Sequence, residues 1–170
     1  MSLSDPRSSS GRRLFLIGLA ALPLAACGFT PAYGPDGGAG ALRGRVAVQA
    51  PVTKSDFDFV ARLETRLGRA EAAAYDLGYA ISATRQSGGI TAANETTRYT
   101  LRGTATWSLT SRTTGARVAG GEVNGFTSWS ATGTTVAGLA AEDDAARRLS
   151  VMLADQVMTR LLAVAPTLAQ

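Results

Sequence analysis

The chain has 170 residues and a formal net charge of +4, and it contains a single cysteine and no histidine. Without histidine, the sequence excludes Ser-His and Cys-His nucleophilic pairs and the usual zinc-ligand sets. The basic excess is too mild and too scattered for a nucleic-acid-binding protein. We therefore predict no enzymatic activity, no catalytic residue, no metal site, no cofactor and no nucleic-acid partner.

The N-terminus has the layout of a secretory signal peptide. Arg12 and Arg13 precede an apolar run over residues 14–24, which is shorter than the roughly 20 residues needed to span a bilayer. The run leads through a Leu-Ala-Ala sequence to Cys27, and this segment resembles the bacterial lipobox. The resemblance implies that residues 1–26 are removed and that Cys27 is acylated, with palmitate among its lipids. The alternative is an ordinary cleaved signal that leaves a free thiol at Cys27.

The residues around this segment bear on the export route and the destination. Arg12-Arg13-Leu14-Phe15-Leu16 resembles a twin-arginine signal, but paired arginines are also common in general-secretion signals, so both routes stay open. Gly28 follows the cysteine, at the position where an aspartate typically retains lipoproteins at the inner membrane of enteric bacteria. By that resemblance we expect a lipid-anchored protein of the outer membrane.

Behind the lipobox the sequence predicts a tether, one domain and a short tail. Residues 27–44 are rich in Gly, Pro and Ala, which is typical of a flexible linker. Residues 45–166 are the predicted domain, and residues 167–170 are a tail. The domain begins with an alternating strand over residues 45–50, which is stopped by Pro51.

An amphipathic helix is predicted over residues 55–77. Ser55 is a capping residue, Asp56 and Asp58 lie in the first turn, and the helix is expected to end near Gly78. The apolar positions recur at helical spacing, namely at Phe57, Val60, Leu63, Leu67, Ala70, Ala74 and Leu77.

Three strands are predicted next, over residues 79–85, 98–111 and 117–129. The second alternates most regularly, with apolar or small residues at odd positions and arginine, threonine or serine at even positions. One face of the sheet is therefore buried and the other is wet. Turns are expected at residues 87–89 and 113–115. The glycines of the last strand indicate a bulge or an irregular segment there, namely Gly120, Gly121 and Gly125.

A closing helix is predicted over residues 139–164, with acidic residues 142–144 in its first turns and Pro166 at its end. Its apolar stripe is Leu149, Met152, Leu153, Val157, Leu161 and Val164. Core packing is the expected role of this stripe, and a partner-binding face is the alternative. The element order is β-α-β-β-β-α. We therefore predict an α+β two-layer sandwich of about four strands, with both helices on one face and a parallel, right-handed crossover at its start.

Two segments carry a resemblance to a known family. The first is Cys27-Gly28-Phe29-Thr30-Pro31-Ala32-Tyr33. The second comprises the aromatic-ended strand Phe126-Thr127-Ser128-Trp129 and the closing helix over residues 139–161. Together with the element order, these segments resemble the LptE family of lipopolysaccharide-assembly lipoproteins over nearly all of the chain after residue 26.

The resemblance implies a non-catalytic partner of the LptD β-barrel. Members of the family plug this barrel, assist its assembly and help to deliver lipopolysaccharide to the outer leaflet. We therefore expect a lipid anchor at the outer membrane, with the domain on the periplasmic side or in the barrel lumen. Whether lipopolysaccharide is bound directly stays open.

Three other functions also stay open. An auxiliary lipoprotein of an ABC-type phospholipid transport system would have the same lipobox and a similarly small α/β domain. A periplasmic hydrolase with paired carboxylates and a purely structural envelope lipoprotein are the further alternatives.

Four arginines are candidate contacts for lipid A phosphates or for the barrel, because arginine binds phosphate bidentately. Arg98 and Arg102 share the predicted wet face of one strand, and Arg112 and Arg117 flank the predicted hairpin turn. Charge and strand face alone support this choice. Ordinary solvated arginines are the alternative.

Overall fold

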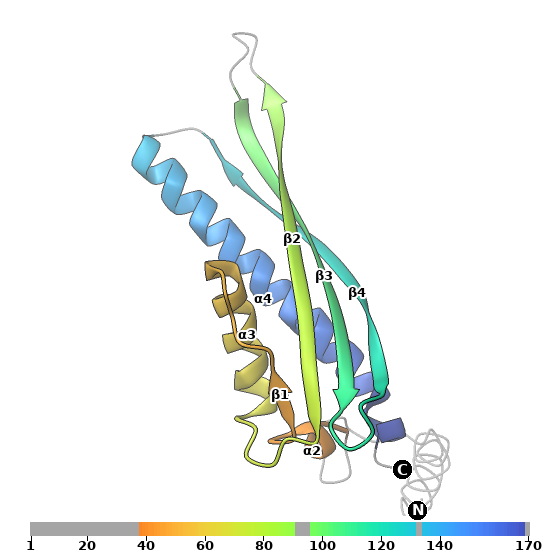
Figure 1. Ribbon diagram of the computed structural model, residues 1–170. Coiled ribbons are helices and arrows are strands. Elements are labelled where there is room, and N and C mark those ends of the chain that lie inside the picture. Colours follow the sequence, from red (N-terminus) through yellow and green to blue (C-terminus); the bar gives the residue numbers. More distant parts are fainter. Residues whose placement is uncertain (1–37, 91–95, 132–133, 169–170) are drawn as a thin grey trace, which may run out of the picture. The chain divides into compact units, whose positions relative to one another are not determined.

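The computed structural model describes residues 38–90, 96–131 and 134–168 (Figure 1). The elements follow one another as α2 (Gly38–Leu42), β1 (Val46–Val48), α3 (Lys54–Leu67), β2 (Tyr75–Ile90), β3 (Thr96–Ser111), β4 (Arg117–Ser130) and α4 (Thr135–Leu168). This order confirms the predicted α+β class and adds one short helix, α2, before the first strand. Cys27 and the predicted signal peptide of residues 1–26 lie outside the described residues.

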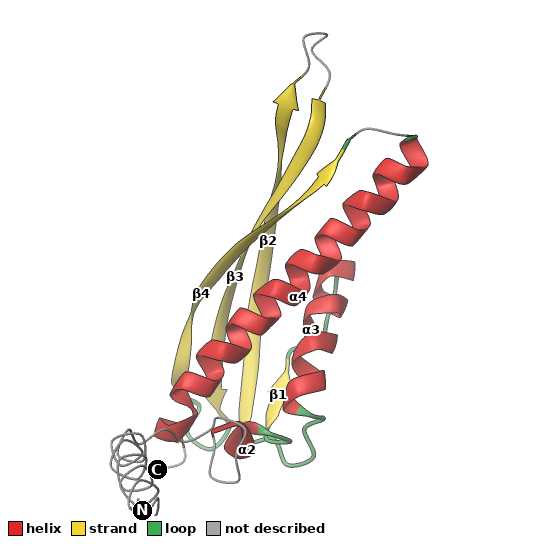
Figure 2. Ribbon diagram, turned by 180° about the vertical axis from the view of Figure 1, so that it is seen from behind, coloured by secondary structure: helices red, strands yellow, loops and turns green. Residues whose placement is uncertain are grey.

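The sheet has the spatial order β1-β2-β3-β4. β1 is parallel to β2, and β2, β3 and β4 form an antiparallel meander. The parallel pair is short, from Val46 and Tyr75 to Val48 and Leu77, whereas β2 pairs with β3 along its whole length. Figure 2 shows α3 and α4 side by side on one face of the sheet, as predicted.

The core lies between this sheet face and the helices. The odd-numbered residues of β3 point into it, as the alternation predicts, and the helices supply the opposite wall. The core includes Leu77, Trp107 and Leu109 from the sheet, Phe59, Leu63 and Leu67 from α3, and Leu149, Leu153, Val157, Met158 and Leu161 from α4. Each buried side chain of this size stabilises the fold by roughly 1.5–3 kcal/mol. The apolar stripe of α4 therefore packs in the core, with Met152 at its half-exposed margin.

α3 begins at a different cap from the one predicted. Thr53 is the N-cap: its hydroxyl accepts from the Asp56 N–H, and the Asp56 carboxylate accepts from the Thr53 N–H. These two bonds form a capping box, which satisfies two backbone donors that the helix leaves unpaired. The resulting helix face buries Phe59 and leaves Phe57 59% exposed, so the predicted core position at Phe57 is wrong.

The predicted extension of this helix to residue 77 is also wrong. Gly68 ends α3 at φ +74°, a conformation that glycine adopts without strain. Tyr75 and Leu77 then lie in β2, where their spacing of two places both in the core. The segment satisfies the helical and the strand period alike, and pairing with β1 and β3 decides between them. β2 also continues through the predicted turn at residues 87–89.

β4 is regular where its glycines indicated a bulge. Gly120, Gly121 and Gly125 all pair in register with β3. The irregularity lies at Val118, because Leu109 pairs with Ala119 while Thr110 pairs with Arg117. The glycine at position 125 instead gives α4 room to approach the strand, since a Cβ there would come within 2.8 Å of the Met152 sulfur.

α4 is longer than predicted at both ends. It begins at Thr135, so the acidic residues 142–144 lie beyond its first turn and make ion pairs instead of complementing the helix dipole. It continues past Pro166 to Leu168. A proline removes a backbone hydrogen bond, but in the last turn it disturbs few of them.

Residues 38–44 belong to the domain and not to the predicted tether. α2 buries Leu42 completely in the core. The Gly44 N–H donates to the Leu67 carbonyl at 2.7 Å, and the Gly44 carbonyl accepts from the Glu71 N–H at 3.2 Å. These contacts join α2 to the end of α3. The small residues around Leu42 conceal this burial from the sequence pattern.

Candidate binding face

The sheet face opposite the helices is polar along β2, β3 and β4. The pairing register places even-numbered residues of all three strands there, in rows that cross the sheet. They include Ser82, Thr84 and Gln86 on β2, Arg98, Thr100, Arg102, Thr104 and Thr106 on β3, and Glu122, Asn124, Phe126 and Ser128 on β4. We call this surface the outer face. Hydroxyl, amide and guanidinium groups dominate it, so it is suited to a polar environment.

Arg102 lies in the middle of the outer face. Its Nε donates to the Gln86 Oε1 atom at 2.9 Å, and its guanidinium carbon lies 5.8 Å from the centre of the Phe126 ring. The phenyl ring and the amide hold the guanidinium over the sheet, with donors left for an anion. Arg98 is exposed on the same face. In the described part of the chain, neither arginine forms an ion pair with a carboxylate.

Arg112 and Arg117 lie at the other end of the sheet. Arg112 forms an ion pair with Asp76. Its Nε and Nη2 atoms donate to the same carboxylate oxygen, at 2.9 and 2.6 Å. The hydrogen bond from Arg112 lowers the pKa of the Asp76 carboxyl below its ordinary value. The Arg117 Nε donates to the Ala119 carbonyl at 3.4 Å. Arg112 is therefore occupied by a structural ion pair.

The four sequence-predicted arginines do not form one site. Arg102 and Arg112 are ten positions apart, nine of them along the extended β3 strand, and a strand rises roughly 3.3 Å per residue. The two groups are thus separated by about 30 Å. Only Arg98 and Arg102 remain candidates for a common ligand on the outer face.

A second cluster, which the sequence did not indicate, lies on the helix-facing side at the Ile90 end of β2. The Arg85 Nη1 atom is 3.1 Å from the Glu142 Oε1 atom, and its guanidinium lies 5.2 Å from the centre of the Tyr99 ring. Tyr99 in turn packs on Trp129 with the ring centres 5.4 Å apart. Tyr99, Trp129 and Glu142, with Leu139, border a cavity of about 490 Å³. The side chains of the cluster come from three strands and α4, so spacing along the sequence could not reveal them.

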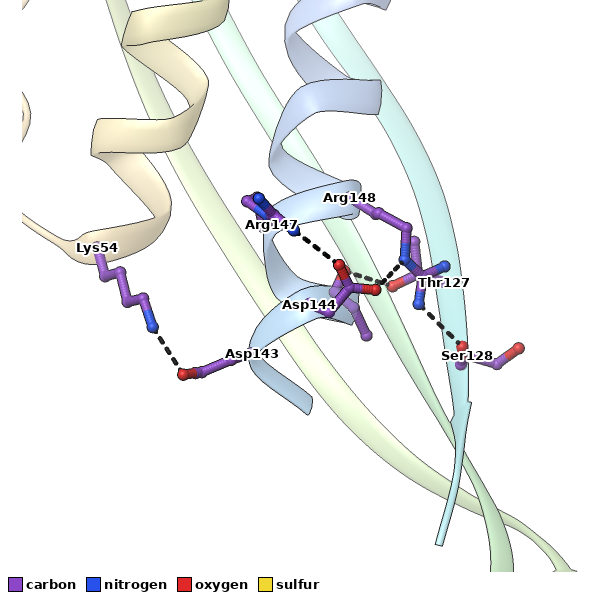
Figure 3. A network of polar contacts seen from close by, with 8 residues as sticks. Lys54, Thr127, Ser128, Asp143, Asp144, Arg147 and Arg148 are labelled. Atoms are coloured by element: carbon purple, nitrogen blue, oxygen red, sulfur yellow. Dashed lines mark hydrogen bonds and ion pairs between the residues drawn. The ribbon is translucent and has the colours of Figure 1, made fainter. Parts of the chain in front are cut away.

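The acidic residues near the start of α4 form ion pairs within the helix and with α3 (Figure 3). Asp144 accepts from Arg147 at 2.9 Å and from Arg148 at 2.8 Å, and these hydrogen bonds lower the pKa of its carboxyl. Asp143 pairs with Lys54 at the start of α3, with 2.8 Å between the charged atoms. The acidic run of α4 is thus used in contacts within the domain. Residues 38–90, 96–131 and 134–168 hold no group of three acidic or cysteine side chains arranged for a metal ion.

The buried side of α4 adds a neutral contact to this network. Thr127 is 5% exposed, and its hydroxyl donates to the Ala145 carbonyl at 2.9 Å. The Arg148 Nη2 atom donates to the Ser128 carbonyl on the same strand, at 3.3 Å. α4 therefore holds β4 by both a buried and an exposed hydrogen bond.

Residues 44–161 match the sequence model of the LptE family, whose description is "Lipopolysaccharide-assembly". The chain belongs to the LptE family. The matched residues run from β1 through β4 and include α4 as far as Leu161.

Solved lipoprotein structures share the LptE fold. A lipoprotein from Caulobacter crescentus CB15 has a TM-score of 0.63 and 19% identity, covering 78% of this chain and 98% of that one. Rare lipoprotein B from Shewanella oneidensis has a TM-score of 0.58 and 11% identity, covering 74% and 98%. A minor lipoprotein from Acinetobacter baumannii has a TM-score of 0.53 and 17% identity, covering 70% and 89%. No curated protein matches the sequence.

Membership of the LptE family indicates the kind of function to which the outer face belongs. The family is one of non-enzymatic lipoproteins with a role in lipopolysaccharide assembly. A hydroxyl-rich outer face that carries Arg98 and Arg102 agrees with a binding role. The predicted acylation site, Cys27, lies outside the described residues and stays a prediction.

Proposed function

We propose that the chain is an outer-membrane lipoprotein, anchored through acylated Cys27, that plugs an LptD-like β-barrel and assists its assembly. In this role it helps to insert lipopolysaccharide into the outer leaflet. The family match over residues 44–161 is the observation that carries the proposal. The outer face supports it, because a barrel lumen is polar and demands no large apolar docking patch.

Arg98 and Arg102 are the proposed contacts for lipid A phosphates or for acidic groups of the barrel. Guanidinium groups bind phosphate oxygens by charge-assisted, often bidentate, hydrogen bonds. The Arg102 guanidinium is already oriented by Gln86 and Phe126, so less side-chain freedom is lost when it binds an anion. Arg112 is left out of this site because Asp76 occupies it.

Affinity purification from outer membranes tests the proposal. The tagged full-length protein is expected to recover a large β-barrel protein in stoichiometric amount. A matched Cys27→Ser variant, which cannot be acylated on sulfur, should recover much less barrel from the outer-membrane fraction. Recovery of inner-membrane ABC transporter subunits without a barrel would contradict the proposal and favour an auxiliary role in phospholipid transport.

A further inference from the structure

The two edges of the sheet are treated differently by the rest of the domain. At the β4 edge, α4 side chains occupy outward-pointing carbonyls: Arg148 donates to the Ser128 oxygen at 3.3 Å, and Gln156 donates to the Asn124 oxygen at 3.0 Å. Covering the edge from Asn124 to Ser128 in this way hinders another strand from adding there. Among the described residues, the β2 edge has such cover only at its base.

β1 covers the beginning of β2 and then leaves it. The Gln49 N–H donates to the Leu77 carbonyl at 2.9 Å, and the Gln49 side-chain oxygen accepts from the Tyr79 N–H at 3.4 Å. Gln49 thus supplies the last hydrogen bonds of the parallel ladder before the chain turns away at Pro51 into α3. Beyond Tyr79, β3 is the only neighbouring strand of β2 in the described part of the chain.

The free edge presents backbone hydrogen-bonding groups at alternate residues. Leu77 and Tyr79 bond toward β1, whereas the Ala80 carbonyl accepts from Thr106 on β3, at 3.4 Å. Because strand residues alternate in direction, the N–H and C=O groups of Ile81, Ala83, Arg85 and Ser87 point away from β3. Residues 82–87 are exposed and contain neither lysine nor proline, which commonly protect edge strands, and their one charged side chain, Arg85, is paired with Glu142 of α4.

A groove accompanies this edge on the helix side. It has a volume of about 450 Å³ and is lined by Tyr79, Ile81 and Ala83 along the strand and by Val52, Thr53 and Asp56 just before and at the start of α3, among others; the Asp56 carboxylate disfavours acidic side chains in the groove. Val52 is 83% exposed. A strand laid along the edge would place every second side chain in the groove, so small apolar residues fit these positions.

The opposite side of such a strand would meet the outer face. On that face, the charged groups beside this part of β2 are Arg98 and Arg102, both on β3, and Arg102 donates to the Gln86 side chain of β2. The carboxylate that β2 carries on this face, Asp76, is at its base and is paired with Arg112. Acidic side chains at alternate positions therefore complement the surface. A second copy of this chain fits poorly, because it would bring its own Arg98 and Arg102 to the seam.

We propose that the β2 edge from Ile81 to Ser87 receives an extended segment of a partner polypeptide whose residues alternate between small apolar and acidic. The segment adds to the sheet as a further strand and continues the ladder that β1 abandons at Gln49. Main-chain hydrogen bonds hold it, the groove selects the apolar residues, and the outer face selects the acidic ones. This inference does not depend on the identity of the barrel partner.

The test uses the full-length protein in mild detergent and a ten-residue peptide that alternates valine and glutamate. Saturable binding is expected, with slower hydrogen exchange at the Ile81, Ala83 and Arg85 amides. A peptide that alternates valine and lysine should bind at least tenfold more weakly. Absence of binding, or equal binding of both peptides, would overturn the proposal.

Paired proline variants locate the binding edge. Ala83→Pro removes an outward N–H of β2 without touching the ladder to β3, and it should weaken peptide binding at least tenfold. Asn124→Pro makes the matched change on the covered β4 edge and should leave binding unchanged. Both variants must keep the far-UV circular dichroism of the parent. An equal loss of peptide binding in both variants would contradict a partner strand at β2. So would a parent protein that forms dimers, if Ala83→Pro abolished the dimers but left peptide binding intact.

Discussion

Gly103 of β3 lies directly against Leu149 of α4: a Cβ on Gly103 would come within 2.7 Å of the Leu149 Cδ2 atom. Leu149 is 2% exposed and has little space to move. Gly103→Ala is therefore expected to lower the free energy of unfolding. Overpacking costs about 1–3 kcal/mol, which exceeds the roughly 0.5–1 kcal/mol that alanine gains over glycine in a strand.

Urea unfolding measures this difference, and Gly88→Ala is the matched control. A Cβ on Gly88 of β2 meets nothing within 4 Å, so this variant should be as stable as the parent or slightly more stable. Gly125→Ala should fall between the two, because the Met152 side chain that it meets is flexible and 39% exposed. A Gly103→Ala protein as stable as the parent would refute the close packing of α4 on β3.

A bidentate ion pair joins α3 to α4. The Arg62 Nε and Nη2 atoms lie 2.9 and 3.0 Å from the two carboxylate oxygens of Asp155, and Arg66 is within 3.5 Å of one of them. We predict that Asp155→Asn lowers the free energy of unfolding by about 1 kcal/mol, near the upper limit for a partly exposed pair.

Asp143→Asn is the control for that prediction. It breaks the pair between Asp143 and Lys54, whose side chains are 67% and 73% exposed. Solvent screens such a pair, so its loss should change stability by less than about 0.5 kcal/mol. Equal effects of the two substitutions in urea unfolding would show that Asp155 does not link α3 to α4.

The Asp76–Arg112 pair should make the free energy of unfolding depend on pH in the acidic range. The hydrogen bond from Arg112 holds the pKa of Asp76 below the ordinary 3.8 in the folded chain. Near and below this pH the unfolded chain binds more protons, so the contribution of the pair is present at higher pH and is lost as the pH falls through the folded pKa. A carboxyl titration followed by NMR should show the pKa of Asp76 rising in Arg112→Ala and unchanged in Arg117→Ala.

The outer-face arginines should affect lipopolysaccharide binding. The double variant Arg98→Ala with Arg102→Ala is expected to weaken binding at least tenfold, since one charge-assisted hydrogen bond contributes about 1.5–3 kcal/mol. The control is Arg112→Ala, which removes an arginine that is already paired with Asp76. If the double variant and the control bind lipopolysaccharide equally, Arg98 and Arg102 are solvated strand residues without this role.

The sequence predicted best where one signal was unambiguous. The alternation of β3 predicted its two faces correctly, because from Arg102 to Thr110 every second residue is buried and those between are half-buried or exposed. The segment around Leu77 was misread because helical and strand spacing coincide there. Leu42 was assigned to a tether because a single apolar residue among small ones carries no period.

Parts of the candidate site depend on register and could not be predicted. Arg85 and Glu142 are 57 positions apart in the sequence. They meet because β2 and α4 are both longer than predicted, so that the Ile90 end of β2 lies beside the first turns of α4. The protected β4 edge likewise requires α4 to place Arg148 and Gln156 beside particular carbonyls. By contrast, the outer-face location of Arg98 and Arg102 followed directly from strand alternation.

Photocrosslinking in intact cells tests most directly whether a β-barrel surrounds the outer face. A photoreactive amino acid in place of Thr106, which is exposed in the middle of β3, reports on whatever contacts this surface. Irradiation is expected to join the protein to one large outer-membrane β-barrel protein, in a product that is absent without light. Crosslinks to inner-membrane transporter subunits, or none to a barrel, would contradict the proposed role.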